Sequence, residues 1–127
     1  MFAKNVVFSA FAVAALTSLP ALAASQKAVD PSVVASLRTI RQDAELIASG
    51  KLRGKSALRA PARDIALQWA KIEPGLSVDG DVMVETKMAN ASIAALEHDW
   101  QTGKDVQSEA KDVSSNIDDL TDAATGH

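Results

Sequence analysis

The sequence contains no cysteine and no tyrosine. Without cysteine the chain has no disulfide bonds, no thiol for lipidation and no attachment site for a c-type haem. All three phenylalanines lie within the first eleven residues, so Trp69 and Trp100 are the only aromatic residues in the rest of the chain. We therefore expect stability to depend on a packed core of mostly aliphatic side chains to which the two tryptophans add bulk.

The N-terminus has the pattern of a secretory signal peptide. Residues 1–4 carry one positive charge, residues 6–19 form an apolar run, and Ala21 and Ala23 place small side chains at the positions that a signal peptidase reads. We predict cleavage after Ala23, with Ala24 as the alternative. The apolar run is too short to cross a bilayer comfortably, so we expect a periplasmic or secreted protein without a stable membrane anchor.

The rest of the chain has four segments with helical periodicity and no strand candidate. In each segment apolar residues recur at alternating steps of four and three, which places them on one face of a helix. We predict a flexible lead-in at residues 24–29, helices over residues 31–49, about 60–72, 82–101 and about 105–120, and a flexible tail at residues 123–127. The predicted core seams are Val33, Leu37, Ile40, Ala44 and Ile47; Leu58, Ala62, Ile65, Trp69 and Ile72; Val82, Thr86, Ala89, Ile93, Leu96 and Trp100; and Val106, Ala110, Val113, Ile117 and Leu120.

Turn and capping residues mark the ends of the first two helices. Asp30 is a suitable N-cap before Pro31, and Gly50 is placed to end the first helix. Pro61 is best accommodated in a first turn, so we start the second helix near Ala60, with one further helical turn from Ser56 as an option.

The last two helices form the clearest hairpin in the chain. Gly103 can adopt the left-handed conformation that ends a helix, and the spacing from Thr102 to Asp105 resembles a capping box for the helix that follows. Four helices joined by short connections predict an all-α fold: an up-down-up-down four-helix bundle of two αα-hairpins over residues 30–122, after a cleaved signal peptide. The protein would be a monomer, or a dimer that exchanges hairpins through the connection at residues 73–81.

Several chemistries that helical bundles support lack their ligands here. Met83, Met88 and His98 share one helix, so they cannot provide axial haem ligands from facing helices. The Glu-x-x-His pairs of di-iron centres are absent. Two thioethers are a weak metal set, and we expect both methionines to pack in the fold. Because His98 is predicted to face outward and no serine has a histidine partner, we expect no cofactor, no metal and no enzymatic activity.

Charge divides unevenly along the chain. Residues 24–71 contain nine basic and four acidic residues, whereas residues 72–127 contain three basic and twelve acidic ones. In an alternating bundle these charges gather at opposite ends. The basic end is a candidate anion site made of Lys51, Arg53, Lys55, Arg59 and Arg63, the last two being assigned to a helix N-terminus. The acidic end is a candidate for a divalent cation or a basic partner and contains Asp79, Asp81, Asp118, Asp119 and Asp122.

These features favour a function in binding. We expect a small exported, non-enzymatic protein that binds another protein of the cell envelope. The alternative is a periplasmic carrier of a small anion, ion or ligand, held at a charged end or in a pocket between helices. A pocket would favour the carrier, and a contiguous exposed apolar strip would favour the protein-binding function. Nucleic acid is not an expected partner, because the exported chain is acidic. The simplest reading of the charges is mutual attraction of the hairpins and a solvated surface.

Overall fold

The computed structural model describes residues 30–76 and 80–126. Within these ranges the fold is all-helical, as predicted, and contains four α-helices and no strand. The elements are α3 (Pro31–Ala48), α4 (Gly54–Ile72), the short 3-10 helix η2 (Glu73–Gly75), α5 (Gly80–Gln101) and α6 (Gln107–Thr125). The predicted signal peptide and lead-in lie outside the described residues.

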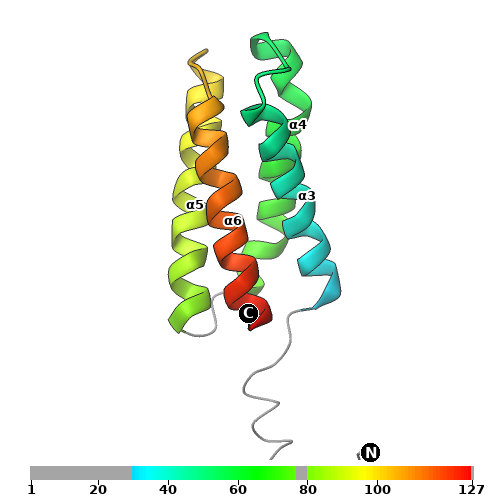
Figure 1. Cartoon of the computed structure of the whole chain (residues 1–127), viewed down its shortest axis with the longest axis vertical. Helices are drawn as coiled ribbons and strands as arrows, with labels where there is room; N and C mark the ends of the chain where they lie inside the picture. The colour runs from blue at the N-terminus through cyan, green and yellow to red at the C-terminus, as the bar shows by residue number, and fades with distance from the viewer. Residues whose placement is uncertain (1–29, 77–79, 127) are drawn as a thin grey trace, which may run out of the picture.

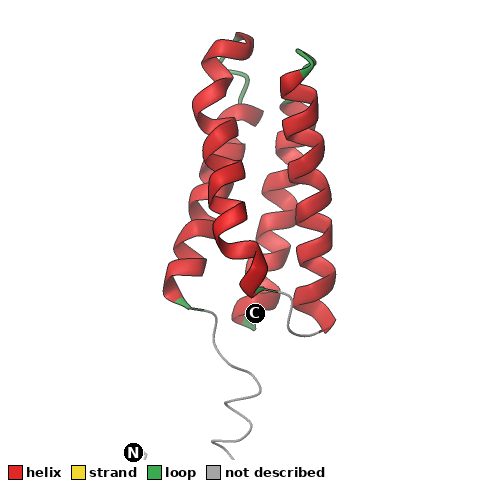
Figure 2. Cartoon of the chain, turned by 180° about the vertical axis from the view of Figure 1, so that it is seen from behind, coloured by secondary structure: helices red, strands yellow, loops and turns green. Residues whose placement is uncertain are grey.

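Successive helices run in opposite directions along a common axis (Figure 1). The helix α3 packs against α4 and α6, and α5 packs against the same two helices, with less extensive contact between α4 and α5. The helix α6 ends at the end of the bundle where α3 begins (Figure 2). In the part of the chain that the structure describes, none of the helices combines the length and apolar character needed to span a membrane.

The core consists of the predicted seams. Every seam residue is buried except Val33, Leu58 and Trp100, which are half-buried and pack against the core. Leu76 and Ala124 also join the core, beyond the predicted seams. Full burial of a leucine or isoleucine side chain contributes about 1.5–3 kcal/mol, so these stripes are the main stabilising feature of the fold.

The ends of α3 are those that the sequence predicts. The Ser32 backbone N–H donates to Asp30 Oδ1 at 2.9 Å, and Pro31 is the first helical residue. After Ala48 the chain leaves the helix, and Gly50 has a φ of 75°, a conformation that side-chain-bearing residues rarely adopt. Local capping chemistry therefore determines both boundaries.

The helix α4 begins at Gly54, earlier than predicted, so Pro61 lies inside the helix rather than in its first turn. Proline cannot donate to the carbonyl of Ala57, but Ala57 is exposed, which lowers the cost of the missing bond. In addition, Leu58 packs against the core and stabilises the turns that precede the proline. The predicted start near Ala60 was wrong, because tertiary packing outweighed the local preference of proline, whereas the optional helical turn from Ser56 is part of α4.

The turn between α5 and α6 is only partly as predicted. Gly103 has a φ of 79°, as expected for a residue that ends a helix. However, Thr102 Oγ1 donates to the His98 carbonyl at 3.1 Å and so completes the end of α5. The N-cap of α6 is Val106, and the carboxylate of the preceding Asp105 accepts the Gln107 backbone N–H at 3.0 Å. The predicted capping box is therefore wrong, because Thr102 points back toward the preceding helix. At its other end α6 continues to Thr125, beyond the predicted boundary.

The two tryptophans differ in burial, and we predict that they differ in their contribution to stability. Trp69 is only 4% exposed and donates through Nε1 to Asn90 Oδ1 at 3.0 Å. Trp69→Ala should lower the free energy of unfolding by about 3–5 kcal/mol, because it leaves a cavity in the core. Trp100→Ala should cost less, since Trp100 is half-buried. Urea unfolding of both variants measures the difference, and an equal or larger loss for Trp100→Ala would contradict this assignment of the core.

Candidate functional site

The α3–α4 connection and the α5–α6 turn lie at the same end of the bundle (Figure 1). They border a cavity of about 300 Å³, which we call the loop-end cavity. Basic, aromatic and aliphatic side chains line it, chiefly Arg53, Lys55, Leu58, Trp100, Lys104 and Val106. The predicted basic end of the bundle is therefore hollowed rather than flat.

Lys55 and Trp100 form one fixed wall of this cavity. The Lys55 ammonium donates to the Gln101 carbonyl at 2.8 Å and lies 5.6 Å from the centroid of the Trp100 ring. The Trp100 indole N–H donates to the Lys55 carbonyl at 3.0 Å. These contacts join the first turn of α4 to the last turn of α5, and the distance of the ammonium from the ring is in the range of a cation–π interaction.

The structure brings together only some of the predicted anion-site residues. Arg53 and Lys55 line the loop-end cavity, and Lys51 lies in the adjoining connection. Arg59 and Arg63 do not line it, because α4 begins at Gly54 and places both on the exposed surface of the helix interior. Their assignment to a helix N-terminus was wrong.

Lys104 lines the cavity but was missed by the sequence analysis. An available signal was its place in the α5–α6 turn, because an alternating bundle puts that turn beside the α3–α4 connection.

The predicted acidic residues that the structure describes come from two helices. Asp79 lies outside the described residues. Asp81 is in the first turn of α5, whereas Asp118, Asp119 and Asp122 belong to α6. Asp118 lies 2.9 Å from Arg41 Nε and is therefore paired. Over residues 30–76 and 80–126, no group of three or more His, Cys, Asp or Glu side chains is placed to hold a metal ion.

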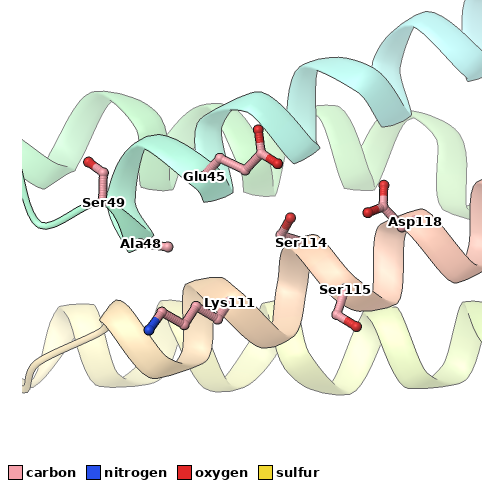
Figure 3. A pocket seen from close by; sticks show the side chains of 7 residues that line it. All are labelled: Glu45, Ala48, Ser49, Lys111, Ser114, Ser115 and Asp118. Atoms are coloured by element: carbon pink, nitrogen blue, oxygen red, sulfur yellow. The ribbon is translucent and has the colours of Figure 1, made fainter.

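A second hollow, of about 460 Å³, runs between α3 and α6. Glu45 on α3, Ser49 just after that helix, and Lys111, Ser114 and Asp118 on α6 lie along its walls (Figure 3). Its lining contains both charge signs and no histidine. The groove therefore offers neither an activated nucleophile nor a field of one sign that would concentrate a charged ligand.

Two carboxyl groups meet between α3 and α4. Asp43 and Asp64 are hydrogen-bonded to each other, and Gln68 Nε2 donates to Asp64 Oδ1 at 3.5 Å. Asp43 Oδ2 is buried without a hydrogen-bond partner. Burial, then the hydrogen bond to Asp64 and its negative charge, raise the pKa of Asp43 to about 7. The sequence analysis missed this pair, because both residues lie outside the predicted seams.

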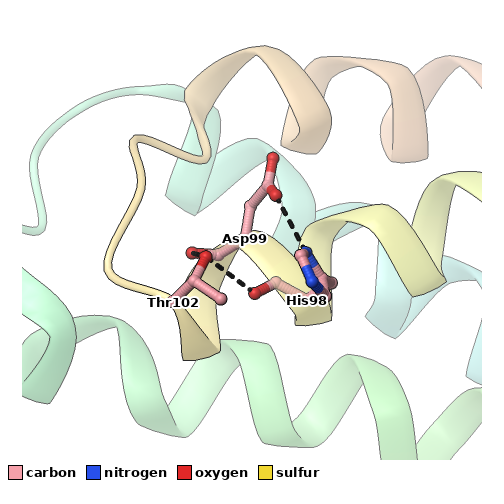
Figure 4. A network of polar contacts seen from close by, with 3 residues as sticks. All are labelled: His98, Asp99 and Thr102. Atoms are coloured by element: carbon pink, nitrogen blue, oxygen red, sulfur yellow. Dashed lines mark hydrogen bonds and ion pairs between the residues drawn. The ribbon is translucent and has the colours of Figure 1, made fainter.

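A polar network closes the end of α5 (Figure 4). His98 Nδ1 lies 3.3 Å from Asp99 Oδ1, and a hydrogen bond links Asp99 to Glu109. The hydrogen bond to Glu109 and, to a smaller extent, the one to His98 lower the pKa of Asp99. The hydrogen bond to Asp99 and, to a smaller extent, burial raise the pKa of Glu109. The His98 side chain is 69% exposed, in agreement with its predicted outward orientation. The network joins α5 to α6. Within it, no serine or threonine hydroxyl is hydrogen-bonded to the His98 imidazole.

The helix α5 is apolar on two faces. Its inner face carries the core seam, and Val84, Met88, Ala91 and Ala95 recur at steps of four, three and four along the opposite face. All four are exposed, Val84 at 54% and Met88 at 53%. We call this row the α5 strip. The expectation that Met83 and Met88 pack in the fold was wrong, because both are exposed.

Acidic side chains border the α5 strip on the side of α6. Asn116 Nδ2 donates to the Met88 carbonyl at 3.3 Å, which fixes the register of the two helices. Asp112 and Asp119 lie one turn on either side of Asn116, on the same flank of α6, and Glu85 is on α5 itself. None of these three carboxylates has an ion-pair partner among the residues described. Lys87 borders the other side of the strip, so the frame is acidic overall.

Comparison with known proteins leaves the site to be interpreted from its own geometry. The chain matches no family model, and no curated protein or solved structure shows significant similarity to it.

The carboxyl pair predicts a pH dependence of stability. The pKa of Asp43 is about 7 in the folded protein and near 3.8 when the chain is unfolded, so the folded state binds more protons between these values. The stabilising contribution of Asp43 to folding is complete below pH 3.8 and is lost as the pH rises through 7. The wild-type protein should therefore have a higher Tm at pH 5.5 than at pH 8.

The variant Asp43→Asn should remove most of this difference. It places a neutral group beside Asp64, and for a partly exposed pair a gain of about 1 kcal/mol, or about 4–8 °C in Tm, is expected at pH 8. Thermal unfolding followed by circular dichroism tests this, with the exposed Asp112→Asn as the matched control. A Tm of Asp43→Asn that changes between pH 5.5 and 8 as much as that of the wild type would exclude the pair as the cause.

Proposed function

We propose that this is a non-enzymatic binding protein that engages another protein of the cell envelope through the α5 strip. The observation that carries the proposal is the exposure of Val84 and Met88 on a helix whose opposite face already fills the core. A helix needs only one apolar face for folding, so a second apolar face is available for a partner. The signal-peptide pattern of residues 1–23 supports a periplasmic or secreted location for this function.

The partner segment that suits the strip is a basic amphipathic helix. Its apolar side would pack along Val84 and Met88, and the small Ala91 and Ala95 allow two helix backbones to approach closely. Lysine and arginine on its flank would face Glu85, Asp112 and Asp119, which gives charge complementarity. Methionine side chains adapt to different apolar shapes, so Met88 suits a surface that binds by packing. A strip this narrow fits a transient interaction.

An enzymatic function has less support. His98 is held beside Asp99 at the end of a helix, and the serines of the α3–α6 groove have no histidine among their neighbours in its lining. General acid–base or nucleophilic catalysis needs a base within hydrogen-bond reach of the group it activates.

The second candidate function is that of a carrier for a small anion. The loop-end cavity supports it, because a hollow of about 300 Å³ with Arg53, Lys55 and Lys104 in its lining is a suitable place for a negatively charged ligand.

We expect the α5 strip to bind a synthetic amphipathic peptide built from leucine and lysine. Met88→Asp should weaken this binding by about tenfold or more, because it places a charge in the apolar contact. Fluorescence anisotropy of a labelled peptide measures the affinity. The matched control is Leu67→Asp, which makes the corresponding change at a leucine that is 64% exposed on α4.

A second peptide, with glutamate in place of lysine, tests the acidic frame. It should bind at least tenfold more weakly, and the binding of the lysine peptide should decrease as salt is added. Equal binding of both peptides, or an equal loss in Leu67→Asp, would contradict the proposal. A dimer in analytical ultracentrifugation that Met88→Asp dissociates would instead assign the strip to a second copy of this chain.

A further inference from the structure

The loop-end cavity has an excess of positive charge. Arg53, Lys55 and Lys104 line it, against one carboxylate, Asp105, which accepts the Gln107 backbone N–H. None of the three bases lies within ion-pair distance of a carboxylate in the described part of the chain, although the charge of Lys104 contributes to lowering the pKa of Asp99.

The start of α4 adds to this positive potential. Arg53 occupies the N-cap position without a side-chain cap, and the first turn contains no acidic residue. The helix therefore presents backbone N–H groups and the positive end of its dipole at the cavity without a negative group of its own. Gly54 leaves the space in front of this turn open, because a Cβ built there meets no atom within 4 Å.

Apolar groups form the rest of the lining. The half-buried Leu52, Leu58 and Trp100 line the cavity, beside Ile47 and Val106, which the core already buries. The Trp100 ring is held by its hydrogen bond to the Lys55 carbonyl, so this surface is formed before any ligand arrives. A bare inorganic anion would leave the exposed parts of Leu52, Leu58 and Trp100 without contacts, whereas a ligand with a short apolar tail would cover them.

The volume limits the size of the ligand. About 300 Å³ is at the small end of ligand pockets. At about 30 Å³ for each liquid-like heavy atom, the space holds on the order of ten non-hydrogen atoms. We infer that the loop-end cavity binds a small amphiphilic anion, which has one carboxylate-like head and a short aliphatic or aromatic tail. This inference rests on the second candidate function, that of a carrier, and it specifies the class of cargo.

The indole N–H groups provide a direct test on the intact protein. In ¹H–¹⁵N correlation spectra, titration with octanoate should shift the Nε1–H signal of Trp100 saturably and leave that of Trp69 in place, because Trp69 donates to Asn90 inside the bundle. Trp100→Phe assigns the two signals. Acetate supplies the head without the tail, octanol the tail without the head, and inorganic phosphate an anion without a tail. Octanoate should bind at least about tenfold more tightly than each of them.

Paired variants test the role of the cations. The double variant Arg53→Gln/Lys104→Gln should weaken octanoate binding by about tenfold or more. The control double variant Arg63→Gln/Lys87→Gln removes the same charge from exposed positions outside the lining and should bind as the wild type does. Thermal unfolding verifies that both double variants fold. If Arg53→Gln/Lys104→Gln does not fold, the single variants Arg53→Gln and Lys104→Gln are used in its place.

Each result that differs from these expectations contradicts a different part of the proposal. A Trp100 signal that responds to no anion contradicts both the inference and the carrier function. Phosphate that binds as tightly as octanoate supports an anion carrier but overturns the amphiphilic cargo. Octanol that binds as tightly as octanoate, or an equal loss in both double variants, overturns recognition of the charged head.

Discussion

Burial of one apolar stripe on each helix is the interaction on which this structure depends, because the chain has no disulfide bond to replace it. The stripes contain several alanines, so the helices gain little from bulky packing at those levels. Among the neighbouring α-helices the contact is least extensive between α4 and α5, and there two indole groups add hydrogen bonds. Trp69 on α4 donates to Asn90 on α5, and Trp100 on α5 donates to the Lys55 carbonyl on α4. Both tryptophans therefore join the two hairpins along the same seam, at different heights of the bundle.

The helix α5 differs from its neighbours in how it distributes apolar residues. The other three helices concentrate theirs on the core side and expose mainly polar residues, as a helix on a protein surface does. In α5 the residues at positions 84, 88, 91 and 95 repeat the spacing of the core seam on the solvent side. An exposed valine and an exposed methionine one turn apart add nothing to the core. Their placement is explained more simply by an intermolecular contact than by folding.

The sequence was sufficient where a boundary or a face depends on local chemistry. Asp30 and Gly50 end α3 through hydrogen bonding and backbone conformation, and the four-three spacing identifies the buried faces. It was insufficient where a tertiary contact decides. Pro61 lies inside α4 because Leu58 packs against the core, and the Asp43–Asp64 pair exists only because α3 and α4 place two carboxyls face to face. The α5 strip is a different case. Its spacing is present in the sequence, but the inner seam alone already explains why this segment is an amphipathic helix.

The charge asymmetry of the hairpins also takes on a more specific meaning in the structure. If mutual attraction of the hairpins were its whole purpose, close ion pairs should join them. Among the residues described, Arg41 and Asp118 form the single lysine- or arginine-carboxylate pair between the two hairpins. Exposed pairs contribute little to stability, and most of the charge is not used in this way. Three of the bases without a carboxylate partner, Arg53, Lys55 and Lys104, line the loop-end cavity. Three unpaired carboxylates, Glu85, Asp112 and Asp119, border the α5 strip. The two surfaces thus carry charges of opposite sign, which is the arrangement expected when each faces a different molecule.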